Sequence, residues 1–103
     1  MVWSAMEELR TIVVNEPATR KQILRLGGTM AIMRTMEEYF EVEVIQYLCC
    51  VVIELLSAME PDARKLVSEI YWIQLIVRSM QDQADSDRVQ EAGRSALATV
   101  CRT

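Results

Sequence analysis

The sequence predicts an all-α protein whose helices form repeats that stack into a solenoid. Two observations predict this fold class: apolar residues recur at helical spacing with few helix breakers, and the chain contains an internal repeat of 44 residues. Only three glycines and two prolines occur in 103 residues, and 51% of the residues are hydrophobic. This composition is typical of a packed helical chain and argues against disorder. Residues 1–103 are therefore expected to form one domain.

The stretch 42–59, VEVIQYLCCVVIELLSAM, is the predicted centre of the fold. Its only charged residues are Glu43 and Glu54, and it contains neither glycine nor proline. A helix that is apolar on nearly every side must be covered on more than one flank, which predicts a mostly buried central helix. Its polar residues, Glu43, Gln46, Glu54 and Ser57, recur at helical spacing. We expect them to form the one stripe that faces water or a partner.

The bounds of the other helices follow from apolar spacing and from breakers. We expect helices at residues 1–14, 18–26, 29–39, 62–70, 72–81 and 88–101. Pro17 stops the first of these helices, and Pro61 follows the long one. The pair Gly27-Gly28 is the strongest breaker, because glycine readily takes the positive φ of a helix end. One of these two glycines is therefore predicted to have positive φ.

The order of short, short and long helix occurs twice, and a shift of 44 positions aligns the two copies without a gap. Identical residues under this shift are Glu16, Pro17, Arg20, Lys21, Ile32, Arg34, Met36 and Gln46 with Glu60, Pro61, Arg64, Lys65, Ile76, Arg78, Met80 and Gln90. The shift also places the first helix on the long helix. We divide the chain into the last helix of a partial repeat (1–14) and two repeats (15–58 and 59–103). A period of about 40–47 residues with two or three helices is typical of HEAT and armadillo solenoids.

Particular residues point to one of these families. Leu26-Gly27-Gly28 precedes an apolar short helix, Ile45-Gln46 begins a long one, and Val89-Gln90-Glu91-Ala92 begins the last helix. In these features essentially the whole chain resembles armadillo repeats. The resemblance implies a right-handed superhelix whose long third helices line a concave face used for protein binding.

The chain departs from the armadillo pattern in two places. Armadillo proteins that hold extended peptides commonly carry an asparagine late in the third helix and a tryptophan one turn earlier. The matching positions here are Thr11, Leu55 and Thr99 for the asparagine, and Glu7, Val51 and Ser95 for the tryptophan. The backbone-clamping recognition of such peptides is therefore not carried over. The second repeat also has Tyr71-Trp72 where the first has Gly27-Gly28, so its first two helices can meet at a different angle.

The binding residues are predicted from the two sides of the long helix. Its inward side is expected to be Ile45, Cys49, Val52, Ile53 and Leu56, with Tyr47, Val51 and Glu54 opposite and Leu55 at the edge. The apolar strip of Val51 and Leu55 is either an interaction patch or is covered by neighbouring long helices. The full set of candidate protein-binding residues is Trp3, Tyr47, Val51, Glu54, Leu55, Glu91 and Arg94.

No group of residues predicts catalysis, a metal site or a cofactor. The chain has no histidine, and Cys49 and Cys50 point about 100° apart on a helix, so they cannot chelate zinc together. Buried packing is the simpler interpretation of these cysteines. The acidic clusters Glu37, Glu38, Glu41 and Glu43, and Asp82, Asp85 and Asp87, each precede a helix, where negative charge is favoured. We expect a protein that is not an enzyme.

Charge and cysteine usage restrict the partners and the compartment. The net charge of −4 disfavours nucleic-acid binding, which needs a basic face. No apolar run is long enough to span a membrane. Three cysteines, two of them adjacent, make a poor disulfide framework, which favours a reducing compartment such as the cytoplasm, with the nucleus as an alternative.

Two functions of different classes remain open. The first is a scaffold that binds a protein or peptide partner on the face lined by the long helices. The alternative is a structural segment of a longer solenoid, or a module that associates with itself. The second interpretation follows from the incomplete repeat count, because Trp3, Met6 and Ile12 have no preceding unit to cover them. It predicts a homodimer through terminal helices, with Trp3 as the anchor.

Overall fold

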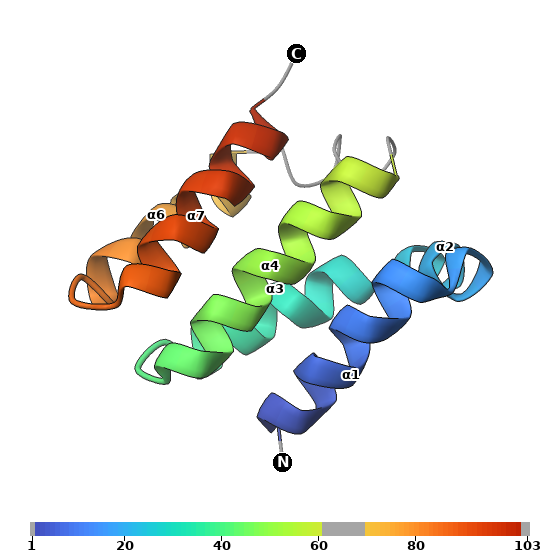
Figure 1. Ribbon diagram of the computed structural model, residues 1–103, viewed down its shortest axis with the longest axis horizontal. Helices are drawn as coiled ribbons and strands as arrows, with labels where there is room; N and C mark the ends of the chain where they lie inside the picture. The colour runs from blue at the N-terminus through green and yellow to red at the C-terminus, as the bar shows by residue number, and fades with distance from the viewer. Residues whose placement is uncertain (1, 61–69, 102–103) are drawn as a thin grey trace.

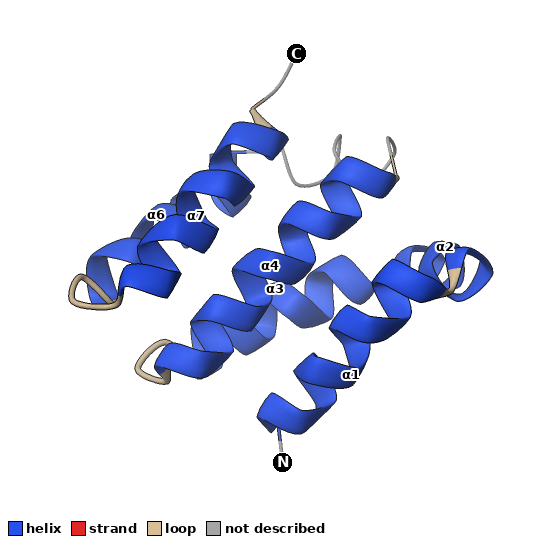
Figure 2. Cartoon of the chain, viewed as in Figure 1, coloured by secondary structure: helices blue, strands red, loops and turns tan. Residues whose placement is uncertain are grey.

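The computed structural model describes residues 2–60 and 70–101, apart from the side chains of residues 2 and 3. All the regular structure in this part of the chain is helical (Figure 2). The helices are α1 (Val2–Asn15), α2 (Pro17–Arg25), α3 (Gly28–Glu38), α4 (Glu43–Met59), α6 (Ile70–Asp82) and α7 (Asp87–Val100). The all-α prediction is confirmed, and these bounds lie close to the predicted ones. The helix predicted at residues 62–70 falls almost entirely outside the described residues.

The helices form two layers. The longer helices α1, α4 and α7 lie side by side and run in the same direction, with α4 in the middle. Helices α3 and α6 lie behind them, and α2 lies at the end of α1, where it is seen nearly end-on (Figure 1). Helix α4 packs against α1, α3 and α7. The molecule measures 36 × 34 × 19 Å, and the shortest dimension matches two helix layers of about 10 Å each.

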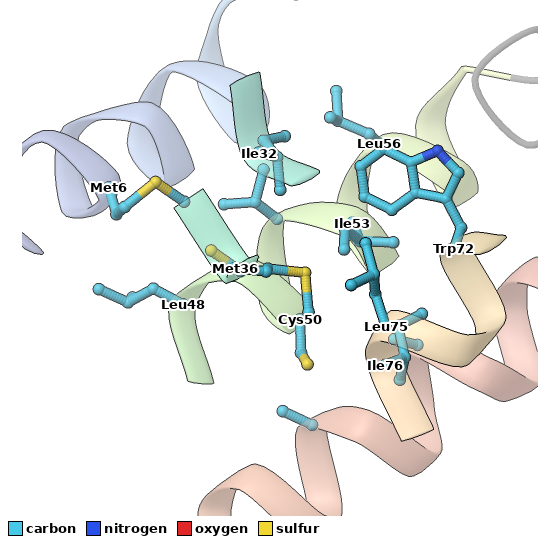
Figure 3. Close-up of a cluster of buried hydrophobic side chains, with 14 of the residues drawn as sticks. Met6, Ile32, Met36, Leu48, Cys50, Ile53, Leu56, Trp72, Leu75 and Ile76 are labelled. Carbon is cyan, nitrogen blue, oxygen red and sulfur yellow. The ribbon is translucent and has the colours of Figure 1, made fainter. Parts of the chain in front are cut away.

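The core lies between the layers and is centred on α4. Its inward side is confirmed, because Ile45, Cys49, Val52, Ile53 and Leu56 are all 2% exposed or less. Helices α3 and α6 cover this side of α4 with Ile32, Met36, Trp72, Leu75 and Ile76 (Figure 3).

The predicted polar stripe of α4 is wrong in two of its four members. Gln46 and Ser57 are fully buried, whereas Glu43 and Glu54 are half-buried. Gln46 can be buried because its side chain is hydrogen-bonded: it donates to two backbone carbonyls and accepts from the Ser79 hydroxyl at 2.7 Å. A buried amide with these partners avoids the cost of an unsatisfied polar group.

The hydrogen bonds made by this glutamine recur 44 residues later. In each case the side-chain amide nitrogen at the start of a long helix donates to two carbonyls at the end of the preceding short helix, at distances of 2.7–3.2 Å. The donor and its acceptors are Gln46, Met36 and Tyr39 in the first set, and Gln90, Met80 and Gln83 in the second. This contact joins α3 to α4 and α6 to α7 in the same way. In each set one of the two carbonyls, that of Tyr39 or of Gln83, also accepts from a backbone N–H of the following turn.

The junction of α2 and α3 depends on two glycines with different roles. Gly27 has a φ of +82°, which confirms the predicted positive φ. Gly28 allows a close approach, because a Cβ built on it would lie 2.8 Å from the Ile23 carbonyl oxygen. Tyr71 and Trp72 stand 44 positions after these glycines and belong to α6 itself. Trp72 is buried in the core. The angle at which α6 meets the segment before it lies outside the described residues.

An arginine on α2 connects the short-helix layer to the ends of two long helices. The Arg20 guanidinium donates to the Val13 carbonyl of α1 at 2.7 Å and pairs with the Glu60 carboxylate, just after α4, at 2.9 Å. Both charged side chains are only 11% exposed. The contact therefore fixes the spacing of α1 and α4 from a partly buried position, where an ion pair is less screened by solvent.

Candidate functional site

The candidate site is the side of α1, α4 and α7 that is turned away from the short helices, here called the long-helix face. On α4 it comprises Tyr47, Val51 and Glu54, which lie opposite the buried side of that helix. The equivalent positions place Glu7 on α1, and Glu91 and Ser95 on α7, in line with them. No described helix covers this face (Figure 1).

Tyr47 lies in a contact between α4 and α7 that the sequence did not predict. The Arg88 guanidinium of α7 stands over the Tyr47 ring, 4.9 Å from its centroid. The same guanidinium makes two hydrogen bonds to the Glu43 carboxylate, at 2.7 and 2.5 Å. The guanidinium covers part of the half-buried Tyr47 ring, so this contact joins α4 to α7.

The carboxylate of Glu43 is held ionised by this contact. Hydrogen bonds from Arg88 and then from the Ser86 hydroxyl lower the pKa of Glu43 from 4.5 to about 2. Ser86 also caps α7, because its hydroxyl accepts from the backbone N–H of Val89. One side-chain cluster thus sets both the start of α7 and its position beside α4.

A signal for this cluster was present in the sequence. Glu43 and Arg88 are 45 positions apart, one more than the repeat period. The counterpart of Glu43 under the 44-residue shift is Asp87, and Arg88 is the next residue. Because α4 and α7 lie side by side, Arg88 stands beside Glu43. The 44-residue shift aligns Glu43 with Asp87 and not with Arg88, so the alignment alone does not predict this pair.

The apolar members of the candidate site, Val51 and Leu55, are neither fully exposed as an interaction patch nor fully covered by neighbouring helices. Val51 and Leu55 are half-buried and pack against the edge of the core. Neighbouring helices therefore cover part of each side chain, and the remainder is accessible. By its helical position Leu55 lies between the outward side of α4 and the side of Val52.

The remaining predicted residues are not all on the long-helix face. Glu91 is exposed and lies on it. Arg94 is exposed and lies at the edge of α7. Its equivalents on the other long helices, Met6 and Cys50, are buried on the side that faces the next long helix. The side chain of Trp3 lies outside the described residues. The structure therefore brings Tyr47, Val51, Glu54 and Glu91 to one surface and separates Arg94 from them.

Other groups that could carry chemistry serve the fold. Cys49 and Cys50 are buried in the core. Burial raises the pKa of the Cys49 thiol well above its usual range and that of Cys50 to about 12, so both stay protonated at neutral pH. Among the described residues, no three cysteine, aspartate and glutamate side chains are grouped so that they could hold a metal ion. Asp87 and Glu43 lie in first helical turns, where negative charge is favoured.

None of the described helices combines the length and the hydropathy needed to cross a membrane. Comparison of the chain with protein-family models, with curated proteins and with solved structures found no match. Function is therefore inferred from the geometry and chemistry of the described residues.

Proposed function

We propose that the protein is a non-enzymatic scaffold of the armadillo type, and that it binds a protein or peptide segment on the long-helix face. One observation carries this proposal: three long helices lie side by side in one layer and leave an outward surface on which Val51 and Leu55 are partly accessible among polar side chains. A rigid, shallow surface of this kind suits an elongated partner that contacts several helices at once.

The recurring hydrogen bonds support the solenoid part of the proposal. Gln46 and Gln90 make the same contacts 44 residues apart, and each long helix follows its short helix in the same way. When successive units pack through the same contacts, their equivalent positions line up and form one extended surface. The proposal that the protein is not an enzyme is supported by the surroundings of its reactive side chains. The Cys49 and Cys50 thiols are buried in the core, and the Glu43 carboxylate is paired with Arg88.

Peptide selection followed by mapping tests the proposal. Random peptides displayed on phage are selected on the wild-type chain, and the binders are added to the isotope-labelled protein for NMR. We expect the largest amide shifts on α1, α4 and α7. Val51→Gln keeps the size of the side chain but removes an apolar contact, so it should weaken these binders. Ala18→Gln, at an exposed position on α2, is the matched control.

Two results would argue against the scaffold function. Selected peptides that shift the amides of α2, α3 and α6 would place binding on the other layer. Binders whose affinity is the same for wild type and for Val51→Gln would show that the apolar part of the long-helix face takes no part in binding. The melting temperature of each variant is measured first, so that a loss of binding is not confused with unfolding.

A further inference from the structure

We infer that the partner segment on the long-helix face carries two positive charges with an apolar residue between them. This inference rests on the proposed function and names the chemistry of the partner. It follows from the net negative charge of the long helices, from the carboxylates that already pair with Arg88 and Arg10, and from the spacing of the carboxylates that remain.

The described long helices carry net negative charge. Helices α1, α4 and α7 contain six acidic and three basic residues. The basic residues of the short helices are concentrated on α2, which contains three of them and lies at the end of α1, whereas α3 and α6 together contain three acidic and two basic residues. A cationic segment is therefore attracted to the long helices, which favours its encounter with the long-helix face.

Two of the three arginines beside the face are occupied by carboxylates of the same chain, and the third, Arg94, is exposed at the outer edge of α7. Arg88 is held by Glu43 in a two-pronged contact, and Arg10 pairs with Glu7 across one helical turn at 3.6 Å. Glu54 and Glu91 have no ion-pair partner among the described residues. The charge that the face offers to a partner is therefore that of Glu54 and Glu91.

The spacing of these two carboxylates sets the spacing of the partner's charges. Glu91 stands at the position equivalent to Tyr47, so it lies about two helical turns, or roughly 10 Å, before Glu54 along the axis. Adjacent helix axes are about 8–10 Å apart, which gives a separation of roughly 14 Å. An extended chain covers about 13 Å in four residues. Lysines or arginines four positions apart match this spacing, and a residue between them passes over Val51.

The test compares two labelled peptides by fluorescence anisotropy. In the first, lysines four positions apart flank a leucine, and in the second, glutamates replace the lysines. We expect the lysine peptide to bind at least about tenfold more tightly at low salt, with the difference shrinking as salt screens the charges. The double variant Glu54→Gln/Glu91→Gln should raise the Kd of the lysine peptide by about threefold to tenfold, as for two exposed ion pairs. Glu38→Gln/Glu41→Gln removes the same charge outside the long-helix face and should leave the Kd nearly unchanged.

Each contrary outcome has a distinct meaning. Equal affinity for the two peptides, or equal weakening by the test and control variants, overturns the charge inference. If Val51→Gln still weakens both peptides, the scaffold function survives that failure. If neither peptide binds at low salt, the inference is wrong, while the peptide selection still decides the function. A dimer of the free protein that Glu54→Gln/Glu91→Gln separates also overturns the inference, because a second copy would then occupy the face.

Discussion

Gly27 shows how one residue can set the path between two helices. Its φ of +82° lies in the left-handed region, and a Cβ added there would meet open space. The cost of substitution is therefore a backbone cost alone. Replacing Gly27 with Ala should lower the free energy of unfolding by about 1–2 kcal/mol, measured by urea denaturation. Gly27→Asn is the control and should cost less, because asparagine tolerates this conformation. Equal stability of wild type and Gly27→Ala would show that the junction does not need positive φ.

Glu43 gives the protein an acid-sensitive contact. The pKa of Glu43 is lowered from 4.5 to about 2 when the protein folds, because Arg88 and Ser86 donate hydrogen bonds to the carboxylate. A lowered pKa stabilises the folded state above pH 4.5, and this stabilisation is lost as the pH falls from 4.5 towards 2. We expect the stability of the wild type to decline through this window, measured by chemical denaturation at a series of pH values.

The variant Glu43→Gln isolates this effect. It cannot titrate at position 43, so its stability should depend less steeply on pH between 4.5 and 2 than that of the wild type. Identical slopes for the two proteins would show that the contact with Arg88 contributes nothing to folding. An NMR titration of the Glu43 side chain measures the pKa directly, and a value near 4.5 would lead to the same conclusion.

At the scale of elements, two glutamines attach long helices to short ones, but their surroundings differ. Gln46 is buried and also accepts from Ser79 of α6, so it joins α3, α4 and α6. Gln90 makes the corresponding pair of donor contacts from a half-buried position. Removing Gln46 leaves more buried polar groups without a partner, which should make it the more important of the two for stability.

Matched substitutions test this difference. We expect Gln46→Leu to lower the free energy of unfolding by about 1–3 kcal/mol, because the Met36 carbonyl and the Ser79 hydroxyl each lose a hydrogen bond in the buried core. Gln90→Leu should cost about half as much, since water can reach the groups that it leaves. Denaturant titrations of both variants provide the comparison. A larger loss for Gln90→Leu would reverse the order that burial predicts.

At the scale of the whole molecule, the first long helix presents a polar edge. Val52 of α4 and Ala96 of α7 are buried, but the equivalent residue of α1 is Glu8, which is exposed. The expectation that Met6 lies bare at this end is wrong. Met6 is only 6% exposed, because it is on the side of α1 that packs against α4. The apolar surface expected to drive association at α1 is thus smaller than the sequence indicated.

The last described helix has a charged residue at its own edge. Arg94 is exposed, whereas Met6 and Cys50, its equivalents on α1 and α4, are buried against the next helix. A cation at this position opposes the docking of another apolar helix, because burying an unpaired charge is costly. Glu8 and Arg94 therefore place a charge at each of the two edges of the long-helix layer.

These edge charges lead to a prediction about assembly. The double variant Glu8→Val/Arg94→Met gives both edges the apolar character of the interior positions, so it should associate at lower concentration than the wild type. Sedimentation velocity over a range of concentrations measures both proteins. It also tests the homodimer through terminal helices expected from the sequence. Indistinguishable behaviour of the two proteins would show that Glu8 and Arg94 do not limit association.

The sequence by itself determined the helices, the inward side of α4 and the glycine turn. Each of these depends on a local property: the 3.6-residue period places Ile53 and Leu56 on one side, and the backbone of Gly27 needs no distant partner. The tertiary structure alone decided that Gln46 is buried, that Arg88 pairs with Glu43 over Tyr47, and that Arg94 lies at an edge. The physical reason is that a helical period fixes only the direction of a side chain. Whether that direction leads to water, a carbonyl or a charge depends on the neighbouring helix that packs there.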